Sequence, residues 1–496
     1  PIEVLNEAKQ FFSDREFTKR RRVCGYTIDG PHSKDLDDGF DIRMNGRNYL
    51  LEISIADVAS AVRPGTKVFD EALARVETQY LALFNVPMIP RVLSENRLSL
   101  LPGGLRPAIT YTMEITPECQ VVSFVMEETA FTSIRKLDYD EFDDVLINNP
   151  DDPDHEKFAL AAELARNLIK LRRSHGALVI YDLMKGLYTN EEGVVMAAEK
   201  SARYMSHLVI QELMVLTNTT IASYFARNDL LFLFRNHTAR IGAPQRGEMF
   251  EQITVAIRDA EFLNYVQNQA SVWFNRAEYS PRLLGHFGLN LQAYAHCTSP
   301  IRRIADLLNQ LLIKAHINGI DVPFSQAYLE GKSGHINEVI FANKESKASY
   351  LKDKAMRNAI GQLRSSTDSD MLMMDYANFE AVAVAAAKSG EMNDYLRTAL
   401  LLNLEENKID YYLAYVLLFV APDDGEAWTE LRELALLYIH KRKGFPNQML
   451  TILETKMGLG VEINVQPTQG KNFSSIVKLF KEGNEFATPE PRINRD

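Results

Sequence analysis

The residues with the clearest capacity for chemistry are the aspartates of residues 27–42, TIDGPHSKDLDDGFDI. They are Asp29, Asp35, Asp37, Asp38 and Asp41. Carboxylates gathered this closely repel one another, and they stay ionised near neutral pH only if a cation neutralises them or water screens them. Strand-like runs flank the cluster, and Gly30, Pro31 and Gly39 let the chain turn so that the side chains converge.

Carboxylate oxygens without histidine or cysteine favour Mg²⁺, Mn²⁺ or Ca²⁺ over zinc. An EF-hand loop fails on spacing, because the sixth position counted from Asp35 is Phe40 where that loop requires glycine. A solvated acidic loop remains open as the alternative, and neither interpretation names a reaction.

A second stretch with chemical potential is residues 286–310, HFGLNLQAYAHCTSPIRRIADLLNQ. It predicts a helix capped by Ser299, with Pro300 in the first turn. Arg302 and Arg303 would then lie near the positive end of the helix dipole, where guanidinium groups suit phosphate oxygens. Two solvated arginines on a helix surface are the alternative.

Taken together, the two stretches resemble the catalytic RNB domain of the ribonuclease II / ribonuclease R family. That family's motifs read TIDG-x4-D-x-DD and AYxxxTSPIRR-x-xD, and here they follow in the same order about 260 residues apart. Three intervening segments also resemble the family: ISIADV, FNVPMIPRVLSENRLSLLPG and LFRNH. The resemblance implies an α+β fold in which helices surround a mixed sheet.

The resemblance further implies a hydrolytic exoribonuclease that degrades single-stranded RNA from the 3′ end and releases nucleoside 5′-monophosphates. Two divalent ions, Mg²⁺ or Mn²⁺, would activate water and stabilise the leaving oxygen. Residue by residue, the metal ligands would be Asp29, Asp35, Asp37 and Asp38. The catalytic residues would be Asp35, Asp37 and Arg302, with Asp37 indispensable and Arg302 holding the scissile phosphate. Asp41 lies outside the motif and is expected to be structural.

The RNA-binding residues implied by the same resemblance are Tyr80, Glu212, Tyr294, Arg303 and Glu345. Tyr80 would pack against the RNA near its 3′ end, and Glu345 would contact ribose. Without the resemblance, a tyrosine that ends an amphipathic helix is more often part of a core. A lone helical glutamate such as Glu212 is more often a solvated surface residue.

The chain divides by sequence pattern into a lead-in (1–22), an RNB-like catalytic domain (23–365), a helical region (371–443) and a small α/β module (444–496) that could bind RNA. The acidic segment 138–156 is expected to be a surface excursion. The family's OB-fold domains have no counterpart in these patterns, which leaves the grip on RNA undefined.

Net charge, cysteine content and the length of apolar runs limit which class of protein this can be. The 496 residues carry a net charge of −11, which argues against wholesale nucleic-acid binding but allows a local basic channel. The three cysteines exclude a disulfide framework and suit a reducing, cytoplasmic location. The longest apolar run, 411–421, is too short to cross a membrane. Two other functions stay open: an inactive RNB-like regulator that binds RNA, and another carboxylate–metal phosphoesterase.

Overall fold

The computed structural model describes the chain except for residues 11–15, 81–84, 179–186, 190–194, 198–204, 259–272, 366, 407, 410, 423–424 and 442–496. It divides into two compact units, Pro1–Ala342 and Asn343–Asp496, which are considered separately. The α/β module predicted for 444–496 lies outside the described residues.

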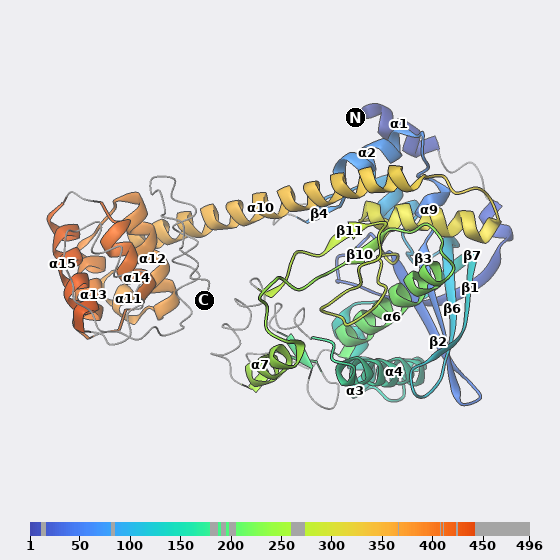
Figure 1. Cartoon of the computed structure of the whole chain (residues 1–496), viewed down its shortest axis with the longest axis horizontal. Coiled ribbons are helices and arrows are strands. Elements are labelled where there is room, and N and C mark those ends of the chain that lie inside the picture. Colours follow the sequence, from blue (N-terminus) through green and yellow to red (C-terminus); the bar gives the residue numbers. More distant parts are fainter. Residues whose placement is uncertain are drawn as a thin grey trace, which may run out of the picture. The chain divides into compact units, whose positions relative to one another are not determined.

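The first unit is built on a closed barrel with strand order β1-β2-β3-β6-β7 (Figure 1). The strands are β1 Arg21–Ile28, β2 Asp38–Asn45, β3 Asn48–Ala56, β6 Arg106–Ile115 and β7 Val121–Leu137. Neighbours pair antiparallel except β1 and β7, whose parallel pairing closes the barrel. The predicted mixed sheet is therefore confirmed, and its closure removes both exposed edges.

Among the described residues, three two-stranded sheets lie outside the barrel. They pair β4 Gln79–Tyr80 with β5 Asn85–Val86, β8 Leu187–Thr189 with β9 Val195–Ala197, and β10 Phe234–Asn236 with β11 Glu278–Ser280.

Helices surround the barrel, with α4 against β2 and α9 against β7 (Figure 1). In the described part of this unit the helices are α1 Ile2–Gln10, α2 Lys67–Arg75, α3 Tyr139–Asn148, α4 His155–Ser174, α6 Met205–Arg227, α7 Arg246–Arg258, α9 Ile304–Asn318 and the first part of α10 Gln326–Ser365. Short helical turns are η1 Glu16–Lys19, η2 Val58–Ser60 and η3 Leu93–Arg97.

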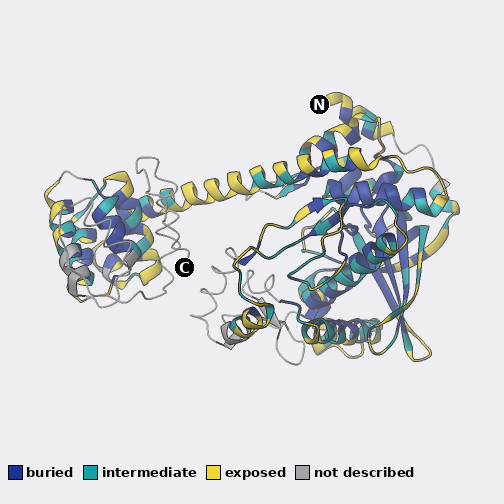
Figure 2. Cartoon of the chain, viewed as in Figure 1, coloured by how far each residue is buried: buried dark blue, intermediate teal, exposed yellow. Residues whose placement is uncertain are grey.

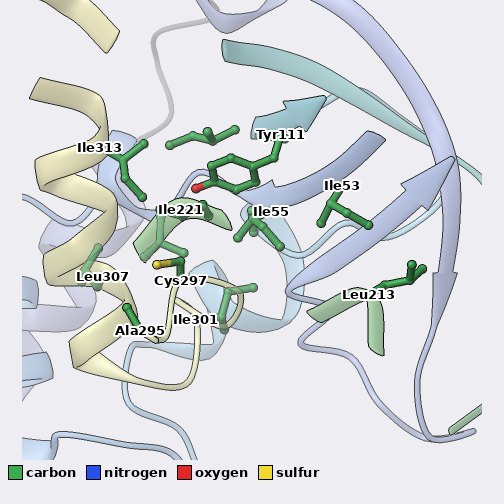
Figure 3. Packing of buried hydrophobic residues seen from close by; sticks show 14 of the residues in the cluster. Ile53, Ile55, Tyr111, Leu213, Ile221, Ala295, Cys297, Ile301, Leu307 and Ile313 are labelled. Atoms are coloured by element: carbon green, nitrogen blue, oxygen red, sulfur yellow. The ribbon is translucent and has the colours of Figure 1, made fainter. Parts of the chain in front are cut away.

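The core lies between the barrel and the helices (Figures 2 and 3). Ile53, Ile55 and Tyr111 face it from β3 and β6, and Ile221 and Ile313 face it from α6 and α9. The segment that contains the second motif enters the same core, with Ala295, Cys297 and Ile301 fully buried. Burial of this segment gives the motif a fixed position relative to the barrel.

Two predicted features differ from the structure. Residues 138–156 do not form a surface excursion but α3 and the start of α4. Asp138 and Glu141 form a capping box for α3, and Phe142 and Val145 are buried. The helix expected to begin at Ser299 begins instead at Ile304.

That shift has a local cause. The Ser299 N–H donates to the Asp306 carboxylate at 2.8 Å, and the Ile304 N–H donates to the Val76 carbonyl at 2.8 Å. Because these donors are bonded in this way, residues 299–303 form a non-helical turn ahead of α9.

The second unit consists, in its described part, of the end of α10 and five further helices. These are α11 Asp368–Met373, α12 Tyr376–Ser389, α13 Asp394–Glu405, α14 Tyr411–Phe419 and α15 Glu426–Lys441. Their hydrophobic cluster is separate from that of the first unit. Over the described residues, no helix is long and apolar enough to cross a membrane.

Candidate active site

The aspartate loop connects β1 to β2, as the sequence predicts. Residues 29–37 follow the end of β1, and Asp38 begins β2. Two side chains hold this loop. Lys136 Nζ donates to the Ser33 carbonyl at 2.7 Å, and the buried Ser99 hydroxyl accepts from the Leu36 N–H at 2.9 Å. The loop is therefore fixed from β7 and from the segment that follows η3.

Gly39 has a different role from the one predicted. It lies inside β2 rather than at a turn, and a Cβ atom placed on it would lie 2.7 Å from the Phe131 ring. A side chain there would displace either the ring or the strand. Its small size therefore lets β2 pass beside the Phe131 ring.

Asp37 joins the two motifs. Its carboxylate is buried, and Oδ1 accepts from the Ile301 N–H at 2.7 Å. Arg302 Nε lies 3.6 Å from Oδ2, and Oδ2 has no hydrogen-bond partner among the described residues. Burial raises the pKa of Asp37 well above its ordinary value, although Arg302 and the Ile301 N–H oppose the rise. Asp37 is therefore under-coordinated for an ionised carboxylate.

The pKa values of Asp29 and Asp38 are also raised, by burial and by a neighbouring carboxylate. Burial and the charge of Asp29 raise the pKa of Asp38 to about 7. Burial and the charge of Asp35 raise the pKa of Asp29, against hydrogen bonds from the Gly30 N–H at 2.7 Å and the Ser33 hydroxyl at 3.0 Å. A cation beside these groups would stabilise their ionised forms.

Asp35 is bonded to Tyr80, whose hydroxyl donates to Asp35 Oδ2 at 3.1 Å. Tyr80 does not end a helix, because α2 ends at Arg75 and Tyr80 lies in β4. Tyr80 as a whole residue is 45% exposed, so the core alternative does not hold. Asp41 is buried and ion-paired with Lys157 of α4, which agrees with a structural role.

The aspartates fit a hard divalent ion. They offer carboxylate oxygens alone, and the Asp37 Oδ2 atom lacks a partner within the described structure. Where the chain is described, no group of three or more acidic, histidine or cysteine side chains is already arranged to hold a metal ion. Mg²⁺ suits such a site, because it binds through one or two carboxylates and takes its other ligands from water and substrate phosphates.

The two arginines of the second motif have different surroundings. The Arg302 side chain is 41% exposed and donates to the Ser299 hydroxyl at 2.9 Å. Arg303 forms an ion pair with the fully buried Asp306, with Nε–Oδ2 and NH2–Oδ1 distances of 2.8 Å each. Arg302 is thus accessible to a phosphate, whereas the Arg303 guanidinium is already occupied.

The surroundings of the other predicted RNA-binding residues differ from one residue to the next. Tyr294 is buried with its ring against those of His286 and His296. Glu212 is buried in α6 and ion-paired with Arg172 of α4. Glu345 is exposed on α10, in the second unit. The structure therefore unites Tyr80 and Arg302 with the aspartates and favours structural roles for Tyr294 and Glu212.

Sequence reasoning missed Tyr139, the first residue of α3. Its ring stacks on His207 with centroids 3.9 Å apart. Burial raises its pKa to about 12, and the negative charges of Asp29 and Asp38 add to the rise. A signal was present, because Tyr139 closely follows the end of the strand that pairs with β1.

Comparison with known proteins identifies the family. A family model for the RNB domain matches residues 18–319, well over half of the chain. Ribonuclease R of Thermotoga maritima is 30% identical over 326 residues, which cover 60% of this chain and 46% of that protein. Ribonuclease R of Aquifex aeolicus is 28% identical over 402 residues, 73% of this chain and 57% of that protein. The chain spans about half the length of these curated relatives.

Solved structures agree at the level of the fold. The apo form of Mycoplasma genitalium RNase R superposes with a TM-score of 0.62 at 19% identity, covering 73% of this chain and 62% of that one. Yeast Ssd1, described as a pseudonuclease, gives 0.56 at 19% identity, covering 69% and 46%. With the barrel, the aspartate loop and the arginine turn in place, this chain belongs to the RNB domain family.

Proposed function

We propose that this protein is a divalent-metal-dependent exoribonuclease that degrades single-stranded RNA from the 3′ end and releases nucleoside 5′-monophosphates. The observation that supports this proposal most directly is the contact between the two motifs at Asp37. This carboxylate accepts the Ile301 N–H, faces Arg302 and leaves Oδ2 without a partner in the described structure. Negative groups that need a cation thus lie beside a guanidinium that can hold a phosphate.

The chain's own residues support a phosphodiester reaction. Arg302, half-exposed and oriented by the Ser299 hydroxyl, would bind a phosphate oxygen and neutralise charge that develops during hydrolysis. The Ile301 N–H fixes the Asp37 carboxylate. Tyr80, bonded to Asp35 and partly exposed, offers a ring face on which a terminal base can stack.

The metal would be held by Asp29, Asp35, Asp37 and Asp38, whose oxygen ligands suit Mg²⁺ or Mn²⁺. When bound, such ions supply a water nucleophile at neutral pH and stabilise the leaving oxygen. The raised pKa values of Asp29, Asp37 and Asp38 support this assignment, because a cation would stabilise the ionised carboxylates that burial and neighbouring charges disfavour.

The relatives support RNA as the substrate class. Relatives in the family bear the name Ribonuclease R, and Mycoplasma genitalium RNase R has been solved with single-stranded RNA and with double-stranded RNA. For this chain the 3′ to 5′ direction and the products are part of the proposal.

A second candidate is an RNA-binding protein without nuclease activity. The likeness to Ssd1, a pseudonuclease, shows that the fold alone does not imply activity. The retention of Asp29, Asp35, Asp37, Asp38 and Arg302 favours the active enzyme.

The test is incubation of the full chain with single-stranded RNA labelled at either the 3′ or the 5′ end, with Mg²⁺ or with a chelator. The proposal expects immediate release of labelled mononucleotide from the 3′-labelled RNA and a shortening ladder from the 5′-labelled RNA. Chelator should stop both. Asp321→Asn, which neutralises an exposed carboxylate outside both motifs, is the control for loss of charge.

Each contrary outcome has its own meaning. RNA that is bound but left intact in Mg²⁺ and in Mn²⁺ would support the inactive binder. Internal fragments without mononucleotide would indicate an endonuclease, and release from the 5′ end would overturn the direction.

A further inference from the structure

A solvent-exposed stretch of α10 carries basic residues on one face. Every residue from 344 to 355 is exposed, so more than three turns of this helix face solvent over that length (Figure 2). Five basic and two acidic residues fall between 344 and 357, in a chain whose net charge is −11. Positive charge is therefore concentrated locally on an acidic protein.

The helical register arranges part of this charge in a line. Lys347, Tyr350, Lys354 and Arg357 stand at positions i, i+3, i+7 and i+10, which share one face of an α-helix. We call these four residues the basic stripe. They extend over about 15 Å at 1.5 Å per residue. Glu345 projects from the opposite side by the same count.

The stripe is available to a ligand. Lys347, Lys354 and Arg357 are exposed and form no ion pair with any residue that the structure describes. Tyr350 is 51% exposed, and the adjacent Leu351 is 52% exposed. Charged residues on an exposed helix surface usually serve solubility. Here an exposed aromatic ring, Tyr350, lies between the cations Lys347 and Lys354 on the same face.

From this arrangement we propose that the basic stripe of α10 is an accessory binding surface for single-stranded RNA, outside the aspartate site. Cations spaced along a helix neutralise successive phosphates, and an exposed tyrosine stacks on a base of any sequence. The inference rests on the proposed function for its ligand class. The strand would be bound at α10 by its backbone while its end is processed elsewhere.

An anionic membrane is the main competing partner, because a basic helix with apolar residues can lie on a lipid surface. Between residues 344 and 355 the large exposed apolar side chains are the adjacent Tyr350 and Leu351, and Ala348 and Ser349 precede them. Membrane-surface helices present a broad apolar face, which this segment lacks. The composition favours RNA.

The binding test uses the full chain in the Asp37→Asn background, without divalent metal, and a fluorescein-labelled 20-nucleotide single-stranded RNA. Lys354→Glu is compared with Lys352→Glu, which makes the same charge change two residues away on another face. The double variant Lys347→Glu/Lys354→Glu should weaken binding at least about tenfold and reduce the salt slope by about 0.7 per lost phosphate contact. Tyr350→Ala should weaken it about fivefold without changing the slope.

Equal RNA affinity of the Lys354→Glu and Lys352→Glu variants would contradict the proposed RNA-binding role of the basic stripe. So would a defect confined to vesicles of phosphatidylserine and phosphatidylcholine, with RNA binding intact. Circular dichroism shows whether α10 is retained, since lysine and glutamate have similar helix propensity. Hydrolysis by the parent chain is measured separately. If the parent chain binds RNA through the basic stripe but never cleaves it, the proposed exonuclease activity is refuted and the proposed RNA-binding role of the stripe is not.

Discussion

Asp37 is a buried carboxylate of the site whose negative charge has few compensating partners. It is buried, it receives one backbone hydrogen bond, and it faces an arginine from the other motif. The neighbouring Asp38 carries a second carboxylate whose pKa is raised to about 7. Buried carboxylates whose charge has so few partners commonly serve function at the expense of the stability of the fold.

We expect Asp37→Asn to lower turnover by about 10²-fold or more, the usual scale for loss of a catalytic group. RNA binding should be unchanged or tighter, because a negative charge beside the phosphates is removed. The melting temperature should hold or rise, because a neutral amide is less costly to bury than a carboxylate. Single-turnover kinetics, anisotropy and calorimetry measure the three quantities. Parent-like turnover would place the active centre elsewhere.

Arg303 and Asp306 allow a separate test of whether the second arginine serves structure or RNA. Their pair is buried, so Asp306→Asn leaves an uncompensated guanidinium and should cost about 3–5 kcal/mol of stability. Arg303→Lys should also lower the melting temperature, because lysine cannot reproduce the two-point contact. If Arg303→Lys instead weakens RNA binding at constant stability, Arg303 contacts RNA as the sequence predicted.

At the scale of elements, the aspartate loop is positioned by neighbours as much as by its own sequence. Ser99 bonds its backbone, and Lys136 holds its turn. The turn at residues 299–303 is held by Asp306 and by Val76. A catalytic geometry made from two loops depends on such supports, since small displacements of reacting groups reduce rates strongly.

Ser99→Ala should cost about 1–3 kcal/mol, because the buried Leu36 N–H loses its acceptor. The freed loop should also raise the Mg²⁺ concentration needed for half-maximal activity. Ser94→Ala is the matched control: its hydroxyl is buried and has no partner among the described residues, so its removal should be nearly neutral. Equal behaviour of the two variants would contradict a supporting role for Ser99.

The segment around His286 predicts a dependence of stability on pH. Burial and the neighbouring His237 lower the pKa of His286 to about 3, and the two rings lie 4.9 Å apart. The unfolded chain takes up this proton near pH 6.5, whereas the folded chain does not. The contribution of His286 to stability is therefore complete above pH 6.5 and falls as pH drops toward 3, by at most about 1.4 kcal/mol per pH unit.

Thermal unfolding between pH 8 and pH 5 measures this effect. The melting temperature of the parent should fall more steeply with acidification than that of His286→Gln. His32→Gln, an exposed residue of the aspartate loop, should follow the parent slope. Parallel curves for the parent and His286→Gln would contradict the assignment.

For the whole molecule, two hydrophobic clusters define two units of different character. One is the barrel with its helices, and the other, in its described part, is helical. Separate cores predict separate cooperative transitions.

Calorimetry should therefore resolve two unfolding transitions. Leu51→Ala in the barrel and Leu400→Ala in α13 each remove a fully buried side chain, at a cost of about 2–5 kcal/mol. Each should lower one transition and leave the other unchanged, and Mg²⁺ should raise only the transition that Leu51→Ala lowers. A single transition lowered by both variants would show that the units fold as one.

The sequence by itself determined the chemistry: oxygen ligands at fixed spacing between two strands, and arginines in a distant motif. It also determined the barrel strands, because alternating polarity is a local property. Only the tertiary structure decided that Ile301 meets Asp37 across 264 residues with Arg302 beside it, that Arg303 is occupied by Asp306 and that Tyr139 stacks on His207. It also decided that α9 begins at Ile304, because the donors of the preceding turn bond to Asp306 and Val76. These outcomes depend on which buried groups find partners far along the chain, and no local pattern carries that information.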